Sequence, residues 1–475
     1  MKKIKNEKRY IPSLLLTEIK KSDYARKDDL YVIMDIVYRK QNSLKTNVEK
    51  FHNYVEIPRV TFDLIITNKR YVTSALEFLI ENGWLERLNF YDFENKKSKK
   101  FRIPSNWLGD MKEVEVNDKT INNRIKISKM EMRKNRVKNL EPTKKQYYKN
   151  FKIDEEKAIK ATQNNALEQL RNLAYELELK VDDMALVDVI LCTGEFVKTR
   201  MKFTYHPSKK GLAIHNIIHR MMHHQQRIYS ISQGFLFFKR NSTNGRLDSN
   251  LTTLPSYLRK FITSDEKLFN IDIKNSQPYF LYTVLKEETV VDREEVERYG
   301  KLVIAGKLYE SLIPVFQKIG VIKEHFSQEQ KRNTAKLTLF KIFYSKVTSY
   351  QKIKDAFGQE FPHILKYINE VNAESNSVLA VKLQTRESDT VLDVIAVELQ
   401  GKGIKPLTIH DSLVCLESDM LTTMNVIVSN CERLYGIAPA LKIETLLDET
   451  FQDDGNDFED ENYDYGDGFE SLFVA

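Results

Sequence analysis

The sequence has no long apolar run, few cysteines and no internal repeat. No stretch approaches the roughly 18 consecutive apolar residues of a membrane span, and the polar start of the chain lacks the apolar core of a secretion signal. The three cysteines have neither close pairing nor metal-site spacing, which is typical of a reducing cytosol. We therefore expect a cytoplasmic protein with no membrane partner.

Charge is distributed unevenly along the 475 residues. The whole chain carries a formal charge of +7, and residues 448–475 contain eleven acidic residues and no Lys or Arg, so residues 1–447 carry +18. A basic body of this size favours a polyanionic partner such as DNA, through counterion release. The length predicts two or three domains, and the acidic tail at 448–475 is expected to be disordered.

Residues 28–104 have the pattern of a small unit of helices and strands. Apolar residues recur at helical spacing over 72–80, and Gly83 marks the end of that helix. Two short strands are expected at 84–88 and 101–103, with a polar, basic tip between them.

This order of elements resembles a winged helix, so residues 1–115 are interpreted as a winged-helix-like DNA-binding domain. The exposed start of its second helix carries Lys69 and Arg70, where contacts to a DNA groove would be made. A small protein-binding domain of the same shape is the alternative. Residues 116–153 then predict a basic linker that tracks phosphates, and residues 154–240 a helical region.

Two segments of the C-terminal half place an aspartate at the end of an apolar strand. The run 268–273 is apolar before Asp272 and is followed by a helix start at Ser276. The run 407–416 predicts a tight hairpin with Asp411 at its tip. Two aspartates at adjacent strand ends can bridge a pair of Mg²⁺ ions, because hard cations prefer carboxylate oxygens. Such a pair of ions supports phosphoryl transfer.

A helical stripe lies between these two segments. Its four residues follow one another at steps of four and so share one face of a helix: Arg332, Lys336, Phe340 and Tyr344. A triphosphate needs cations at its phosphate end and a flat surface beside its sugar and base, and the stripe offers both in that order. An ordinary helix with a mixed polar face would explain any two of these residues but not all four.

The order of aspartate strand, helical stripe and His-Asp hairpin resembles motifs A, B and C of the family A DNA polymerases. The phage-type single-subunit RNA polymerases share that palm. Residues 244–247 and 250–251 resemble the family's stretch before motif A, and Gln384 with residues 387–389, before a helix, resembles its glutamine segment upstream of motif C. The resemblance covers about residues 230–447.

This resemblance implies an α+β fold of the polymerase right hand, with a thumb in residues 154–240 and palm and fingers in residues 241–447. It implies a nucleotidyltransferase that uses two Mg²⁺ ions, or Mn²⁺, on a DNA primer–template and nucleoside triphosphates. Catalysis would depend on Asp272, Asp411 and Lys336, the last as proton donor to pyrophosphate. The implied metal ligands are Asp272, Asp411 and the main-chain carbonyl of Ile273. The implied nucleotide contacts are Arg332, Lys336, Phe340, Tyr344 and Gln277. The implied duplex contacts are Arg246, Gln384 and His410.

Several positions depart from the family pattern and leave the choice of sugar open. Gln277 stands where the DNA enzymes usually carry a Glu that crowds the sugar 2′ position. Phe340 resembles the DNA enzymes, whereas Ser412 after the hairpin aspartate resembles the RNA enzymes. Ser345 replaces the glycine that normally follows the helix tyrosine.

The favoured function is a DNA-directed DNA polymerase of a phage, plasmid or other mobile element. One alternative is a single-subunit RNA polymerase or a primase-like enzyme. Another is a non-catalytic DNA-binding replication initiator. A metal-dependent nuclease could also use two aspartates, but it would not need the triphosphate-binding stripe.

Overall fold

A computed structural model describes most of the chain, and helices and strands both contribute to it, as an α+β fold requires. The described residues are 6–43, 54–88, 99–108, 111–132, 137, 139–176, 209–288 and 291–446. The tail at 448–475 and the polar tip between the strands of the N-terminal unit lie outside them. No described helix combines the length and the apolar composition that crossing a membrane requires.

The N-terminal unit packs helices against two small antiparallel sheets. Its helices are α1 (Ser13–Lys21), α2 (Lys27–Ser43), α4 (Arg59–Asp63) and α5 (Lys69–Glu81). Its strands are β1 (Lys8–Pro12), β2 (Val55–Glu56), β3 (Glu86–Leu88), β4 (Lys100–Arg102) and β5 (Met111–Glu115). Strand β1 pairs with β5, and the other three lie in the order β2-β4-β3. The helix and the two strands expected between residues 72 and 103 are therefore present, and the winged-helix interpretation stays a prediction.

Local chemistry sets the ends of α5. The side chain of Asn68 accepts a hydrogen bond from the main-chain N–H of Arg70 at 2.9 Å, which caps the helix start. Gly83, just past the other end, has φ +66°, a left-handed conformation that glycine adopts without a steric penalty.

Most of the described residues in the segment expected to be a basic linker form helices or a strand. Residues 116–153 contain α6 (Lys119–Met132), α7 (Glu141–Asn150) and β6 (Lys152–Ile153). Ile121 and Ile125, one helical turn apart, are buried in the N-terminal core, and Tyr147 of α7 is buried in the core of the C-terminal part. The sequence did not indicate these helices because sparse apolar positions are hidden in a Lys-rich stretch, and the role of a basic linker stays a prediction.

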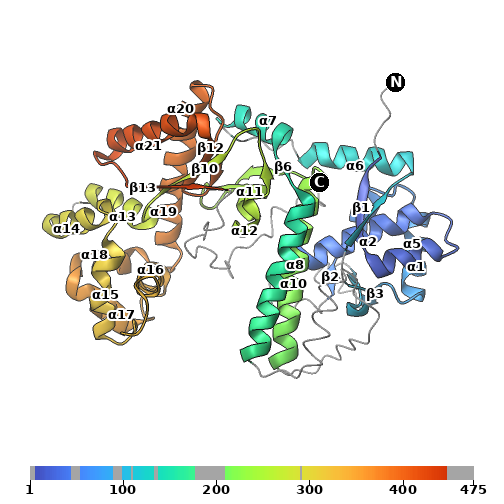
Figure 1. Cartoon of the computed structure of the whole chain (residues 1–475), viewed down its shortest axis with the longest axis horizontal. Helices are drawn as coiled ribbons and strands as arrows, with labels where there is room; N and C mark the ends of the chain where they lie inside the picture. Colours follow the sequence, from blue (N-terminus) through green and yellow to red (C-terminus); the bar gives the residue numbers. More distant parts are fainter. Residues whose placement is uncertain are drawn as a thin grey trace.

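Two long antiparallel helices, α8 (Glu155–Glu176) and α10 (Lys209–Ser232), cross the middle of the molecule (Figure 1). Both contribute to the N-terminal hydrophobic core, since Ala166 of α8 and Met221 and Met222 of α10 are buried in it. The rings of Tyr10 and Tyr229 stack with centroids 3.9 Å apart. The N-terminal unit and this helical pair thus share one core.

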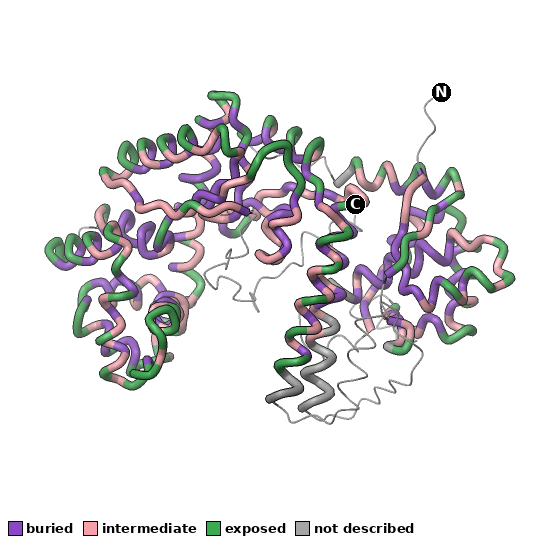
Figure 2. Tube along the Cα trace, viewed as in Figure 1, coloured by how far each residue is buried: buried purple, intermediate pink, exposed green. Residues whose placement is uncertain are grey.

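The C-terminal part is built on a four-stranded antiparallel sheet in the order β11-β12-β10-β13. These strands are β10 (Leu268–Ile273), β11 (Leu407–Ile409), β12 (Ser412–Leu416) and β13 (Leu441–Thr445). Two shorter pairings flank it, β7 (Phe238–Arg240) with β8 (Leu247–Ser249) and β6 with β9 (Ile262–Thr263). Figure 2 shows buried segments both in the C-terminal part and in the N-terminal unit; within the sheet the most buried strand is β12, whereas β13 has no buried residue.

Helices surround the sheet and extend from it. Short helices α11 (Asn250–Thr253) and α12 (Ser256–Arg259) precede β9. After β10 come α13 (Ser276–Glu287), α14 (Arg293–Ile304), α15 (Leu308–Lys318), α16 (Gln328–Tyr344), α17 (Gln351–Glu360) and α18 (Pro362–Val371). A long helical segment then follows, made of α19 (Val378–Ser388), a π-helical stretch over Asp389–Ile395 and α20 (Ala396–Gly401); α21 (Met420–Tyr435) comes after β12. In Figure 1, α15 and α17 extend from one side of the sheet, and α8 and α10 run down on the other.

A buried ion cluster joins the N-terminal unit to the end of α10. Asp35 binds Arg9 at 3.2 Å and Arg39 at 3.0 Å, with all three side chains almost fully buried. Burial lowers the pKa of Arg9 to about 10. The guanidinium of Arg39 lies 4.2 Å and the ammonium of Lys129 lies 4.5 Å from the ring centre of Phe235, just beyond α10.

Replacing Asp35 by Ala should therefore destabilise the protein strongly. Two buried guanidinium groups would lose their shared carboxylate, which costs about 3–5 kcal/mol. Urea unfolding followed by circular dichroism measures this free energy. The matched control is Asp63→Ala, whose partner Arg59 is 41% exposed, and the expected cost there is under about 1 kcal/mol. Equal effects of the two substitutions would contradict the buried cluster.

Candidate functional site

The two aspartates predicted to hold metal ions lie at the same end of the four-stranded sheet. Asp272 of β10 is the antiparallel partner of Ser412, the first residue of β12. Ile409 pairs with Ser412, so His410 and Asp411 form a two-residue turn between β11 and β12. His410 has φ +55°, the left-handed conformation typical of such turns. The predicted hairpin with Asp411 at its tip is confirmed.

The oxygen donors at this edge fit a hard divalent cation. Asp272 and Asp411 offer carboxylates, and the main-chain carbonyl of Ile273 follows directly in the chain. Within the described residues, no group of three or more His, Cys, Asp or Glu side chains could hold a metal by itself. Mg²⁺ commonly binds through one or two carboxylates and completes its shell with water and substrate phosphates. The donor set is compatible with that pattern.

The predicted helical stripe lies on α16. A capping box between Ser327 and Gln330 starts this helix. Lys336 is buried, and its ammonium lies 6.0 Å from the ring centre of Phe340. The rings of Phe340 and Tyr344 are 5.7 Å apart. The helix and its continuous face are confirmed.

Arg332, at the start of the stripe, lies near the surface. Its Nε donates to Glu310 at 2.9 Å, and its guanidinium lies 5.3 Å from the ring centre of Tyr309. Both members of the ion pair are partly exposed, and such pairs contribute little free energy. A ligand with several negative charges could therefore displace Glu310 from Arg332 at low cost.

Side chains from a neighbouring segment cap the far end of α16. Asn372 donates to the main-chain carbonyl of Phe343 at 2.8 Å, and Asn376 donates to that of Tyr344 at 3.0 Å. These amides satisfy carbonyls that have no partner within the helix. They do so although Ser345, rather than glycine, follows Tyr344. The position of Tyr344 is therefore fixed from outside its own helix.

A buried carboxylate, Glu387 of α19, connects three predicted site residues. Its Oε1 accepts from Nε of Arg246 at 2.8 Å, and its Oε2 accepts from Ser276 Oγ at 3.0 Å and from Nε2 of Gln277. The hydroxyl of Tyr344 donates to Oε1 of Gln277 at 2.8 Å. The structure thus brings together the loop after β10, the end of α16, the β7–β8 hairpin and α19.

Burial raises the pKa of Glu387 to about 7, with a further increase from the charge of Asp411, while the guanidinium of Arg246 opposes the shift. Burial also raises the pKa of Tyr344 well above its usual value, and the charge of Asp411 adds to that shift. The charge of Asp411 therefore acts on both Glu387 and Tyr344, which places the hairpin turn close to this hydrogen-bonded network.

The hairpin that carries Arg246 is docked on α19. Gly245 has φ +71°, and a Cβ there would lie 2.6 Å from Ser388 Oγ, so the backbone approaches the helix too closely for a larger residue. Asn244 donates to Gln384 Oε1 at 3.0 Å and accepts from Ser388 at its main-chain oxygen at 2.9 Å. The contact holds Arg246 beside Glu387.

The surroundings of Gln384 differ from the expectation. Residues 387–389 were expected to precede a helix, but Gln384 already lies inside α19, which continues through the π-helical stretch into α20. The Ser and Asp residues there are typical of helix starts, but inside this helix their side chains serve tertiary contacts instead. Ser388 binds Asn244, and Asp389 binds Arg240 at 3.0 Å.

The surroundings of His410 favour its neutral form. Burial lowers its pKa well below the usual value, and the positive charges of Arg246 and Arg259 add to the shift. Its Nδ1 is buried and has no hydrogen-bond partner among the described residues. A neutral imidazole beside the aspartates could receive or donate one hydrogen bond without adding charge.

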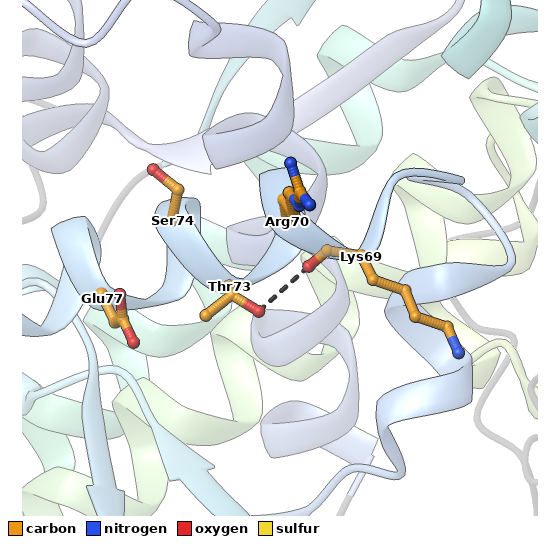
Figure 3. Close-up of a pocket in the computed structure, with 5 residues that line it drawn as sticks. All are labelled: Lys69, Arg70, Thr73, Ser74 and Glu77. Atoms are coloured by element: carbon orange, nitrogen blue, oxygen red, sulfur yellow. Dashed lines mark hydrogen bonds between the residues drawn. The ribbon is translucent and has the colours of Figure 1, made fainter.

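Lys69 and Arg70 are not part of this cluster. Both are exposed at the start of α5 in the N-terminal unit, on the far side of α8 and α10 from the sheet (Figure 1). With Thr73, Ser74 and Glu77 they line a hollow of about 350 Å³ along one face of the helix (Figure 3). The shape and the two cations suit a polyanion, and Glu77 limits the positive charge at the other end.

The sequence did not single out Glu387 as a functional residue. The only nearby sequence feature that could have indicated it is its position three residues after Gln384 on the same helix. Its binding partners lie more than a hundred positions away in the chain.

Comparisons with known proteins give little further information. No protein-family model matches the chain, and no curated protein matches it. Among solved structures, one similar chain is the POL domain of Pol1 from M. smegmatis, in a complex with DNA primer-template and dNTP. That likeness has a TM-score of 0.43 at 13% identity and covers 69% of this chain and 72% of the other. The similarity is too low to define the family, and the site geometry supports the proposals below.

The raised pKa of Glu387 predicts a pH-dependent contribution to stability. The folded state binds a proton more tightly than the unfolded state, whose value is 4.5. The unfolded state therefore binds fewer protons between pH 4.5 and about 7, and stability decreases as pH rises through that window. The expected loss is on the order of 3 kcal/mol. Urea unfolding gives the free energy of unfolding of wild type and of Glu387→Gln at pH 5 and at pH 7.5. The change between the two pH values in the difference between the proteins measures the loss. A difference that stays constant with pH would contradict the shift.

Proposed function

We propose that this chain is a template-directed nucleotidyltransferase, with DNA synthesis on a primer–template as the favoured reaction. The observation that supports the proposal is the hydrogen-bonded network from Tyr344 through Gln277 and Glu387 to Arg246. It joins three segments: the start of α13 after Asp272, the end of α16, and the β7–β8 hairpin that precedes β10. A polymerase needs these groups around one nucleotide.

The metal ligands in this proposal are Asp272, Asp411 and the carbonyl of Ile273. Two divalent ions bound there would activate the attacking 3′-hydroxyl and stabilise the charge of the leaving pyrophosphate. The chain's own contribution is position, because phosphoryl transfer asks for little covalent chemistry from the protein. The end of strand β10 and the tight two-residue turn between β11 and β12 supply the carboxylates.

The α16 stripe would bind the nucleoside triphosphate. Arg332 exchanges Glu310 for the phosphates, and Lys336 pairs with them and donates a proton to pyrophosphate. Phe340 packs on the sugar, and Tyr344 lies beside the templating base. The ring of Phe340 follows Lys336 by one helical turn, so the cation and the flat surface are spaced as a nucleotide requires.

The remaining site residues would contact the sugar and the duplex. Gln277, held between Tyr344 and Glu387, would contact the sugar of the nucleotide and discriminate deoxyribose from ribose. Arg246, Gln384 and the neutral His410 are assigned to the primer–template. Arg246 lies in the β7–β8 hairpin and Gln384 in α19. Because the hairpin is docked on this helix, the two residues would present one continuous surface to a duplex.

The architecture of the proposal is a right hand. The four-stranded sheet would be the palm, α14 to α18 the fingers, and α8 with α10 the thumb. Residues 1–115 would be a winged-helix-like domain that binds DNA through Lys69 and Arg70. The support for this assignment is the placement of the helices on opposite sides of the sheet (Figure 1).

Synthesis with ribonucleotides is the second candidate, and Ser412 favours it. This residue follows Asp411 and is buried, and its hydroxyl donates to the main-chain carbonyl of Ile409 at 2.9 Å. It supplies no carboxylate at a position where the DNA enzymes of the resembling family usually have one. An RNA polymerase or a primase-like enzyme would fit that feature.

Asp272→Ala and Asp411→Ala should each abolish extension of a labelled primer–template with Mg²⁺ while the fold is retained. Each loses a carboxylate that no neighbouring group replaces, so the rate should decrease by at least about a thousandfold. Parallel reactions with dNTPs and with NTPs measure which sugar is used. The control is Asp265→Ala, an exposed aspartate of the same part of the chain.

Full activity in either aspartate variant would contradict the metal assignment. Extension with NTPs, or product without a primer, would transfer the assignment to RNA or primer synthesis. No product from the wild-type protein under any of these conditions would favour the DNA-binding initiator.

The N-terminal proposal predicts a separate effect on DNA affinity. Lys69→Ala with Arg70→Ala should weaken binding to long duplex DNA and lower the salt dependence of the binding constant by one to two phosphate contacts, or roughly 1–2 in the log–log slope. Fluorescence anisotropy across a salt series measures both. The control is the double variant Lys112→Ala with Lys119→Ala, which removes the same charge from exposed positions outside α5. Equal losses in both double variants would contradict a site on α5.

A further inference from the structure

The amide of Gln277 has one orientation that satisfies both of its partners. Both oxygens of the ionised Glu387 carboxylate accept hydrogen bonds, so above its pKa the group facing them must be the NH₂ of Gln277. The carbonyl oxygen then faces the hydroxyl of Tyr344, which donates to it at 2.8 Å. Hydrogen bonds therefore run in one direction, from Tyr344 to Gln277 and from Gln277 to Glu387.

Glu387 is fully buried, with no exposed side-chain surface. Arg246 alone would be enough to balance its charge, and its guanidinium lies 2.7 Å from Oε1. The second oxygen, Oε2, is used for other partners, the adjacent residues Ser276 and Gln277 at the start of α13. One oxygen thus serves charge balance, and the other serves the first turn of the helix that follows Asp272.

We propose that Glu387 is a positioning residue that sets sugar selectivity by holding Gln277 in this single orientation. The inference rests on the proposed polymerase function and goes beyond it, because Glu387 itself touches neither metal nor nucleotide in that assignment. It acts through Gln277. The same carboxylate binds Arg246, so the duplex-contacting hairpin and the sugar-contacting residue share one anchor.

An amide at position 387 would not replace the carboxylate. A Gln there would present its own NH₂ either to Arg246 or to the NH₂ of Gln277, and neither arrangement pairs a donor with an acceptor. The only escape is reversal of the Gln277 amide, which leaves the Tyr344 hydroxyl facing an NH₂ group. Glu387→Gln therefore keeps the volume of the side chain but no longer fixes the Gln277 amide in its wild-type orientation.

The test compares kcat and KM for dNTP and NTP incorporation in three variants. In Glu387→Gln, the preference for whichever sugar the wild type favours should fall by about tenfold, the effect of losing one hydrogen bond that discriminates. Gln277→Glu alone should lower activity with both sugars, because two carboxylates then meet in a buried site. The double swap, Glu387→Gln with Gln277→Glu, restores one carboxylate facing one NH₂ and should return the preference to within about threefold of wild type.

Controls separate positioning from a merely structural role. Asp389→Asn removes the carboxylate that pairs with Arg240 two residues farther along, and it should leave the sugar preference unchanged. A structural role for Glu387 would lower kcat for both sugars alike and leave their ratio intact, and that outcome overturns the proposal. Glu387→Asp is the second variant in case Glu387→Gln fails to fold. It keeps the charge for Arg246 but withdraws it from Gln277, so the preference should again fall, and an unchanged preference in it overturns the proposal.

The outcome for the wild type distinguishes this inference from the proposed function. Wild-type extension that depends on Asp411, together with an unchanged preference in a folded Glu387→Gln protein, overturns the role of Glu387 alone. A wild type that extends a primer with neither kind of nucleotide overturns both the polymerase function and the role that rests on it.

Discussion

The candidate site depends on the antiparallel register between β10 and β12. Because Asp272 faces Ser412, the turn that carries Asp411 lies directly beside it. A slip of one residue would move Asp272 to the other face of the sheet and separate the two carboxylates. Ile271 and Leu413 form a pair in which both side chains are almost fully buried. The slip is unfavourable because it would move such apolar side chains from the packed face of the sheet to the other face. The relative position of the two aspartates is thus set by apolar packing on the opposite face of the sheet.

The ion pair of Glu387 and Arg246 is difficult to explain by stability. Burying a carboxylate with a partly buried guanidinium costs about as much desolvation as the pair regains, and apolar replacements of such pairs are often neutral or stabilising. The raised pKa of Glu387 reflects the same desolvation of the buried carboxylate. A function explains its presence better: the carboxylate accepts from Arg246 through one oxygen and from the start of α13 through the other, which fixes the orientation of the Gln277 amide. The site therefore accepts an energetic penalty for a defined geometry.

The parts of the fold that the sequence predicted are those with strong local patterns. The strand before Asp272, the Asp411 hairpin and α16 each follow from apolar periodicity or turn chemistry within about ten to fifteen residues. The helices within residues 116–153 were not predicted, because the pair Ile121 and Ile125 is a weak signal in a Lys-rich segment. The contact that Glu387 makes could not be predicted, since its partner Arg246 lies 141 positions away in the chain. Local rules find elements, and only the fold shows which buried charge meets which.

The N-terminal unit is held to the rest of the chain by a joint that resists rotation. Phe235 lies between α10 and β7 with Arg39 and Lys129 against its ring, and Asn250 donates to its main-chain carbonyl at 3.0 Å. Turning the unit would separate Arg39 from the ring of Phe235 and from the side-chain oxygen of Gln233, which accepts a hydrogen bond from its guanidinium at 3.0 Å. Its exposed α5 therefore keeps one orientation relative to the β7–β8 hairpin and Arg246. If both surfaces bind DNA, they can do so only along a path of fixed geometry, and a rigid joint of this kind would select that path before any nucleotide enters.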